Sequence, residues 1–240
     1  MTKKQRTIRK SISFSGIGLH TGQQTTMTLH PAEANYGYKF QRSDLPDCPI
    51  IDADVDRVVS TQRGTTLEQN GAQVNTTEHI LAALYGCEVD NALIELTGPE
   101  IPIMDGSSIE FVEALETAGY QDQEANRKYF KLNSNVWYED KEKGVEMLAV
   151  PEPQDEFRIT VMVDYRSPIL GTQHASMYKI SEFKDEIARS RTFVFLREVK
   201  QLANEGLIKG GDLNNAVVLI ERIYSDEELH TIAQLLGKDD

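Results

Sequence analysis

A chain of 240 residues with 40% hydrophobic and 26% charged residues is long enough for one large or two small globular domains, and disorder is not predicted. Asp and Glu outnumber Lys and Arg by 38 to 25, and the net charge of -13 argues against nucleic acid as a partner, because it would repel a phosphate polymer. A small anionic ligand is still compatible with this charge, since a pocket can gather a few cations and backbone donors.

Strands and two helices are predicted for the first part of the chain. Its candidate strands are rich in Thr, Ile, Tyr and Phe and are separated by Gly, Pro and Asn. Asn70-Gly71 supplies the positive φ angles of a two-residue hairpin turn, and Gly119 is suited to end a helix. In chain order we predict strands at 7–14, 24–31 and 36–42, a hairpin around 70–71, a helix at 77–86, a strand at 91–98 and a helix at 108–120.

A polar segment, 121–128, carries charges and has no apolar periodicity, so it is the predicted boundary between two units at 1–125 and 126–240. The second unit repeats the order of strands first and helices later. We predict strands at 129–140, 144–151, 157–165 and 174–180, helices near 181–189 and 198–205, a strand at 215–222 and a helix at 225–237. Runs of strands followed by runs of helices predict an α+β fold with two layers in each unit.

The last predicted helix, 225–237, begins with Ser225 and Glu228 at the spacing of a capping box. Its large apolar side chains recur at helical spacing, so we expect them to face a core. These inward residues are Leu229, Ile232, Leu235 and Leu236.

The two cysteines, Cys48 and Cys87, lack the spacing of a metal site, and the segment MTKKQRTIRK has no character of a secretory signal. A disulfide framework is therefore not expected, and the cytoplasm is the predicted compartment. No run approaches the roughly 18 apolar residues of a membrane span, so no membrane span is predicted.

The stretch NTTEHILAALYG, residues 75–86, places Glu78 and His79 at the start of a predicted helix. A structural explanation is available, because Asn75 and Glu78 stand in the N-cap to N3 relation and a glutamate in the first turn suits the helix dipole. The geometry of the helix, however, favours a functional role for Glu78 and His79. Glu78 and His79 project opposite the apolar stripe, next to Ala82 and Gly86, which leave room for a bound molecule. The stripe consists of Ile80, Leu81, Leu84 and Cys87.

The same stretch does not have the H-E-x-x-H order of a zinc peptidase, because residue 76 is Thr and residue 83 is Ala. If His79 binds a metal, its co-ligands therefore come from elsewhere in the chain.

Five stretches in consistent order, between about residues 4 and 224, resemble one family. They are SGIGLHTG (15–22), NTTEHILAAL (75–84), GPEIPIMDGSS (98–108), RSRTFVFLRE (189–198) and GLIKGGDLNNAVV (206–218). Together they resemble the UDP-3-O-acyl-N-acetylglucosamine deacetylases, the zinc amidases of bacterial lipid A synthesis. The segment MVDYRSPILGTQHAS (162–176) most resembles the form that is fused to a β-hydroxyacyl carrier-protein dehydratase.

This resemblance implies two similar α+β domains that face each other across the active site. It implies that Glu78 is the general base, His79 a zinc ligand, and Thr192 a hydroxyl near the oxyanion. Substrate-binding positions implied by the resemblance are His20, which would lie close to the metal, Phe193 and Phe195, which would flank the acyl passage, and Gly211. The expected cofactor is zinc, and the expected substrate is a UDP-linked acylated glucosamine.

Structural alternatives stay open for most of these residues. His20 and Thr192 could satisfy turn backbones, and Phe193 and Phe195 alternate as core residues of a strand do. Asp105 and Gly106 are expected to serve turn geometry. The other histidines match no ligand of the family: His30, His174 and His230.

The resemblance breaks near the end of the sequence. A catalytic zinc normally has three protein ligands, and the family supplies a further His and Asp, and a general-acid His, after the region of residues 215–218. None of these appears before Asp240. The chain is therefore expected to be an N-terminal portion of a zinc-dependent deacetylase, with the second domain incomplete and part of its apolar surface uncovered. The alternative is a non-catalytic remnant that binds the nucleotide-sugar lipid or a partner chain.

Overall fold

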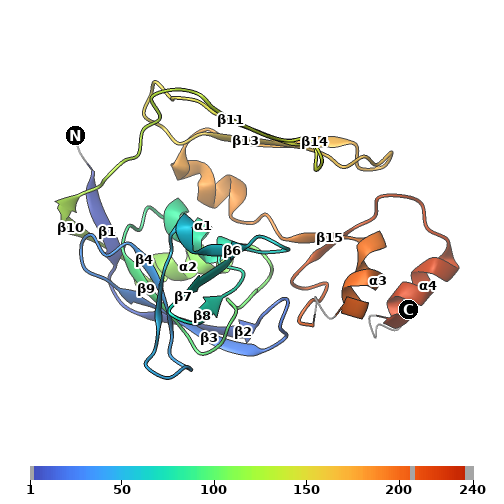
Figure 1. Ribbon diagram of the computed structural model, residues 1–240, viewed down its shortest axis with the longest axis horizontal. Helices are drawn as coiled ribbons and strands as arrows, with labels where there is room; N and C mark the ends of the chain where they lie inside the picture. Colours follow the sequence, from blue (N-terminus) through green and yellow to red (C-terminus); the bar gives the residue numbers. More distant parts are fainter. Residues whose placement is uncertain (1–2, 206–208, 236–240) are drawn as a thin grey trace.

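A computed structural model describes residues 3–205 and 209–235. The first unit is built on a five-stranded sheet in the order β2-β3-β9-β4-β5 (Figure 1). Its strands are β2 (Ile12–Ile17), β3 (Gln24–Pro31), β4 (Tyr38–Arg42), β5 (Ile50–Asp52) and β9 (Ala92–Leu96). Strands β4 and β9 are parallel, and the other neighbouring pairs are antiparallel.

One face of this sheet is polar and the other carries the core, because successive side chains of a strand point to opposite faces. On β3, Met27 and Leu29 are fully buried. The alternate residues Thr26 and Thr28 face outward and pair with serines of β2 through hydroxyl contacts of 2.9 Å.

Helices α1 (Glu78–Gly86) and α2 (Ile109–Ala118) cover the apolar face and lie between the sheet and the later hairpins (Figure 1). Phe111 of α2 packs edge to face against Phe14 of β2, with ring centroids 5.2 Å apart. Gly119 ends α2 at φ 72° and its N–H donates to the Leu115 and Glu116 carbonyls, so the predicted cap is confirmed.

The predicted strand at 7–14 is wrong: the structure has two strands there, in different sheets. Strand β1 (Lys4–Ile8) pairs with β10 (Tyr120–Asn126), and the chain bends before β2. The polar segment at 121–126 is therefore a strand rather than a linker. Its polar side chains are held by amide hydrogen bonds, such as that from Asn91 Nδ2 to Gln123 Oε1 at 2.7 Å. The division at 125/126 falls inside β10 and stays a prediction.

A three-stranded sheet completes the first unit. It contains β6 (Val58–Ser60), β7 (Thr66–Gln69) and β8 (Ala72–Val74), and β6 follows the short 3-10 helix η1 (Val55–Arg57). Asn70 and Gly71 have φ angles of 55° and 75°, which confirms the predicted hairpin turn.

Hairpins and isolated helices make up the second unit, and the α+β class is confirmed. Its strands form two-stranded sheets in the described part of the chain: β11 (Val136–Asp140) with β12 (Val145–Ala149), β13 (Ile159–Asp164) with β14 (Thr172–Met177), and the parallel pair β15 (Phe193–Phe195) and β16 (Val217–Leu219). The helices are η2 (Ile180–Glu182), η3 (Phe183–Ile187), α3 (Leu196–Glu205) and α4 (Asp226–Leu235).

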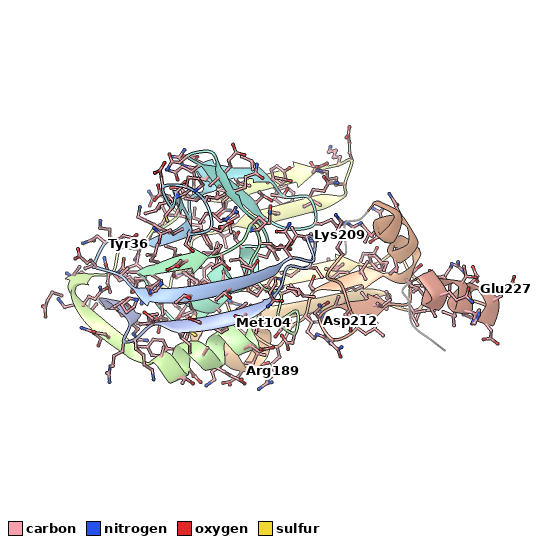
Figure 2. The ribbon with its side chains drawn as sticks, turned by 90° about the horizontal axis from the view of Figure 1, so that it is seen from below. Tyr36, Met104, Arg189, Lys209, Asp212 and Glu227 are labelled. Carbon is pink, nitrogen blue, oxygen red and sulfur yellow. The ribbon has the colours of Figure 1, made fainter. Side chains whose placement is uncertain are left out.

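Large apolar side chains of this second unit are exposed, in agreement with the expectation of uncovered apolar surface. Trp137 on β11 is 57% exposed and Met162 on β13 is 73% exposed. On α4, Leu229 is 39% exposed, so its predicted inward orientation is wrong; the Leu235 side chain and Leu236 lie outside what the structure describes. Figure 2 shows α4, marked by Glu227, at one end of the molecule.

The segment predicted as a helix near 181–189 is a 3-10 turn followed by the π-helix η3. Its widened turn closes with the Ala188 N–H donating to the Phe183 carbonyl at 2.8 Å. Phe183 lies directly against Gly86 of α1, because a Cβ on that glycine would be 2.0 Å from the phenyl ring. The room next to Gly86 that we assigned to a bound molecule is therefore filled by Phe183.

Candidate active site

The start of α1 differs from the predicted N-cap arrangement. Helix α1 begins at Glu78, and Asn75 does not cap it. The Asn75 side chain instead donates to the Pro99 carbonyl at 3.0 Å and accepts from the Thr66 hydroxyl at 2.8 Å. Thr76 adopts a positive φ of 59°, which separates Asn75 from the helix. The Glu78 carboxylate is therefore not used in a capping box and is held by other groups.

Glu78 and His20 meet around Gly64, in the segment between β6 and β7. The Thr65 N–H donates to Glu78 Oε2 at 3.0 Å, and the Arg63 carbonyl accepts from the His20 Nε2–H at 3.1 Å. A Cβ placed on Gly64 would lie 3.4 Å from Glu78 Oε1 and 3.7 Å from His20 Nε2. The two side chains thus converge on the space beside a residue that has no side chain of its own.

A hollow of about 220 Å³ opens at this place, and His20, Arg63, Gly64 and Thr76 are among its lining residues. Glu78 is not among the lining residues, but its carboxylate lies next to Gly64, which is. A carboxylate and an imidazole at such a place can move protons to and from a bound molecule. The hollow is therefore the candidate active site.

The Glu100 carboxylate connects two segments next to the hollow through hydrogen bonds. It is fully buried, and its Oε1 accepts from the His20 N–H at 3.0 Å and from the Thr76 hydroxyl at 2.8 Å. Its Oε2 accepts from the Thr21 N–H at 2.9 Å and from the Thr21 hydroxyl at 2.7 Å. Gly18 makes room for this carboxylate, because a Cβ there would lie 2.2 Å from Oε2. One buried charge, compensated by these donors, joins the His20 turn to the start of α1.

His79 follows Glu78 on α1 and is partly buried. Its carbonyl accepts from the Ser108 hydroxyl at 3.0 Å. Burial lowers the pKa of the imidazole, and the negative charges of Glu78 and Asp105 oppose this shift. The net lowering favours the neutral imidazole, which is the form that binds a metal ion.

Thr192 reaches the first unit through the turn at 104–108. Its N–H donates to the Gly106 carbonyl at 2.8 Å, and the neighbouring Arg191 Nε donates to the Asp105 carbonyl at 2.6 Å. Gly106 has a φ of 85°, and a Cβ on it would be 1.9 Å from the Asn215 carbonyl oxygen, so only glycine fits there. The turn therefore connects Thr192 to His79, since Ser108 of the same turn holds the His79 carbonyl.

Phe193 and Phe195 lie on β15, as the alternation predicts, and form a cluster with Tyr165. The three ring centroids are 5.7 to 6.0 Å apart with edge-to-face geometry. Phe193 is 46% exposed, so this cluster is a surface rather than the interior of a strand pair. The Arg197 guanidinium lies 4.2 Å from the Phe195 ring centroid, a cation–π contact.

Gly211 is exposed and lies in the loop 209–215, which closes on the His20 turn. The Gly210 N–H donates to the Leu19 carbonyl at 3.1 Å, and a Cβ on Gly210 would be 2.1 Å from the Gly18 carbonyl oxygen. Figure 2 shows Lys209 and Asp212 at the two sides of this loop. Gly211 therefore directly follows the residue that contacts the His20 turn.

The remaining histidines take part in local pairs. His30 Nε2 lies 2.9 Å from Glu95 Oε2 on the polar face of the sheet, and His230 Nε2 lies 2.8 Å from Gln234 Nε2 on α4. His174 is on β14, opposite Met162. None of the three is among the lining residues of the hollow.

Among the described residues, the side chains that the structure brings together do not supply a full set of zinc ligands. A catalytic zinc takes three protein ligands and an open position. Within residues 3–205 and 209–235, no group of three His, Cys, Asp or Glu side chains could hold a metal ion. The described residues therefore do not fit a complete zinc centre, and the resemblance assigns His79 alone among them as a ligand. Nor does any helix in the described part of the chain have the length and apolar character needed to cross a membrane.

Comparison with known proteins decides the family. The family model described as LpxC: UDP-3-O-acyl N-acetylglycosamine deacetylase matches residues 5–233. The chain belongs to this family. The resemblance carried by the five stretches is thereby confirmed over nearly the whole sequence.

Relatives of this chain include longer proteins. The bifunctional enzyme LpxC/FabZ of Chlorobaculum tepidum is 47% identical over 236 residues, which cover 98% of this chain and 50% of the relative. The enzyme of the same name from Bacteroides thetaiotaomicron is 45% identical, again over 98% of this chain and 50% of its own length. The UDP-3-O-acyl-N-acetylglucosamine deacetylase of Methylococcus capsulatus is 38% identical over 95% of this chain and 75% of its length. The chain therefore spans half the length of these two bifunctional relatives.

Several residues of the hollow were missed by sequence reasoning. Arg63, Gly64 and Thr65 contact the predicted His20 and Glu78, and nothing in the pattern QRGTT marks them beyond a turn. Glu100 lay inside a quoted family stretch, between Pro99 and a buried Ile101, and a carboxylate in an apolar setting was the available signal.

Proposed function

We propose that the protein containing this chain removes the acetyl group from a UDP-linked, O-acylated N-acetylglucosamine, a step of lipid A biosynthesis. The observation that carries the proposal is the Glu78 carboxylate, which is held by the Thr65 N–H and lies, like the His20 imidazole, next to Gly64 of the hollow. Membership in the deacetylase family supplies the reaction class.

Glu78 has the position and chemistry of a general base. One of its oxygens accepts from the Thr65 N–H, and the other, Oε1, lies next to Gly64, where we propose that it takes a proton from an attacking water. The attack on the acetamide carbonyl gives a tetrahedral oxyanion, and we propose that Thr192 donates a hydrogen bond to it. His20, whose Nε2 carries the hydrogen that Arg63 accepts, is proposed as a substrate-binding group.

The exposed aromatic surface suits the acyl part of this substrate. Phe193 and Phe195, with Tyr165, form an apolar patch that continues from Thr192 along β15. An acyl chain gains roughly 0.8 kcal/mol for each methylene it buries. Gly211, exposed in the loop that closes on the His20 turn, is proposed to admit the polar part of the substrate.

Zinc stays a proposal for the complete protein. His79 offers a neutral imidazole beside the proposed base, and a zinc ion bound there would supply Lewis-acid polarisation of the carbonyl. A second enzyme in the same polypeptide, the expected dehydratase, is supported by relatives whose names include both LpxC and FabZ. The cytoplasmic location likewise stays a proposal.

Substitution of the base tests the function. In the full-length gene product, Glu78→Gln is expected to lower kcat for acetate release by about 10²- to 10⁴-fold and to leave bound zinc unchanged, because the carboxylate acts as a proton acceptor. Glu95→Gln, on the polar face of the sheet, is the matched control and should retain activity. Full activity of the Glu78 variant would refute the assignment.

The non-catalytic alternative has one observation in its favour, the single assigned zinc ligand among the described residues. It predicts that the chain binds the nucleotide-sugar lipid equally well with and without a metal chelator. Binding that is lost on chelation would contradict this alternative and support the metal-dependent deacetylase.

A further inference from the structure

The segment 61–65, between β6 and β7, contacts the proposed base, Glu78, and the proposed substrate-binding residue His20. The Arg63 carbonyl accepts from the His20 ring at 3.1 Å, and the Thr65 N–H donates to Glu78 at 3.0 Å. Both contacts are made by backbone groups. The orientation of His20 and Glu78 therefore depends on where the backbone of this segment lies.

Within the described residues, a side chain of this segment forms an ion pair with the second unit. Arg63 Nη1 lies 3.0 Å from Glu198 Oε2 on α3, and the two side chains are 41% and 28% exposed. The backbone of Arg63 has a φ of 64°, in the left-handed region that a long side chain rarely occupies. Such a conformation persists where the surroundings hold it, and the carbonyl contact with His20 together with the ion pair to α3 provides that hold.

We infer that Arg63 is a positioning residue, which through its ion pair with Glu198 straps segment 61–65 over the hollow and so orients His20 and Glu78. The inference deepens the proposed function and rests on it for its catalytic part. Its structural part stands on the contacts alone. Without the strap, the segment can swing away from α1 and carry the Thr65 N–H off the Glu78 carboxylate.

The expected effect is modest, because the pair is partly exposed and makes a single nitrogen–oxygen contact. Ion pairs of this kind change a local equilibrium by about two- to fivefold at low salt. At 1 M salt the screening length falls to about 3 Å, so the contribution of the pair should largely disappear.

Amide hydrogen exchange at Thr65 tests the strap without any catalysis. In the 240-residue chain at low salt, Arg63→Gln and Glu198→Gln should each speed exchange of the Thr65 amide by about two- to fivefold, and the double variant should add little more. Arg63→Lys, which keeps the charge, should recover most of the protection. The Val112 amide inside α2 serves as an internal reference and should not change.

The matched control is Lys184→Gln. Lys184 Nζ lies 2.5 Å from Glu116 Oε1 with side chains 46% and 42% exposed, so this pair also joins the two units but stands away from the hollow. If Lys184→Gln speeds Thr65 exchange as much as Arg63→Gln does, or if the Arg63 and Glu198 effects simply add, the strap is refuted.

Activity of the full-length gene product tests the catalytic part. Arg63→Gln should lower kcat by about two- to fivefold with a smaller change in KM, and the deficit should vanish at high salt, where both proteins lack the pair. Faster Thr65 exchange with unchanged kcat would refute the positioning role. A failure of the proposed function itself is distinguished by Glu78→Gln, which would then retain activity whatever the exchange experiment gives.

Discussion

The two units of this chain differ in where their apolar side chains lie. In the first unit, Phe40, Phe111 and Ile94 are fully buried between the five-stranded sheet and its two helices. In the second, Phe130 is 91% exposed and Trp137 is 57% exposed. Both units have strands and helices in similar order, so the contrast arises from how the strands pair.

Strand pairing explains the contrast physically. Five hydrogen-bonded strands make a surface broad enough for α1 and α2 to cover, whereas a two-stranded hairpin has little area to bury and is marginally stable alone. The candidate active site draws on both units, since Glu78 and His79 lie on α1 and Thr192 precedes β15. Contacts between a well-packed unit and a loosely packed one therefore set the geometry of the site.

The largest effect is expected from truncating a buried ring of the first unit. Phe111→Ala should lower the free energy of unfolding by about 3–5 kcal/mol, because the ring is fully buried against Phe14 and leaves a cavity. Phe130→Ala is the matched substitution in the second unit and should change stability by less than about 0.5 kcal/mol. Urea unfolding followed by tryptophan fluorescence and circular dichroism measures both. Similar losses in the two variants would mean that the second unit has a core of its own.

An intermediate effect is expected on self-association. Exposed apolar patches beyond a few hundred Å² promote association, and the hairpins β11–β12 and β13–β14 carry a continuous series of such side chains. The chain alone should show concentration-dependent association in sedimentation velocity, and Trp137→Lys should shift it toward monomer. Val55→Lys, at a residue 81% exposed in the first unit, should have no effect. A clean monomer at all concentrations would contradict the expectation.

Local chemistry made part of the fold predictable from the sequence. Asn70-Gly71 and Gly119 occupy the positive φ angles that their residue types favour, and the capping box at Ser225 forms as predicted, with the Glu228 N–H donating to the Ser225 hydroxyl at 3.3 Å. The errors involve distant partners. The polar strand β10 is held by amides from other segments, and η3 is shaped by the contact of Phe183 with Gly86, neither of which leaves a periodic signal.

In the candidate site, too, residues with a local sequence signal could be predicted, and residues that act through distant contacts could not. Glu78 and His79 stand out as an adjacent pair at a helix start, and the resemblance singled out Thr192 and His20. Their partners could not be predicted, because Thr65 acts through its backbone N–H and Glu100 through contacts with segments about 80 and 24 residues away. The predicted N-cap at Asn75 is wrong for the same reason, because the Asn75 side-chain amide donates to the carbonyl of the distant Pro99 instead of capping α1.

The smallest expected effect is a loss of local stability in α4, at the edge of the second unit, when the pH is lowered. The Arg222 guanidinium and the Ser225 N–H hold the Glu228 carboxylate, at 2.7 Å and 2.9 Å, and lower its pKa from 4.5 to about 2. Because the folded pKa lies below the unfolded one, the stabilisation is fully present above about pH 4.5 and is lost as the pH falls toward 2. Amide exchange of α4 should therefore accelerate over that range relative to a Glu228→Gln variant, whose α4 lacks this titration. The amides of α2, in the packed first unit, are the reference, and equal acceleration in both helices of the native chain would show that acid unfolds the two units together rather than the outer helix first.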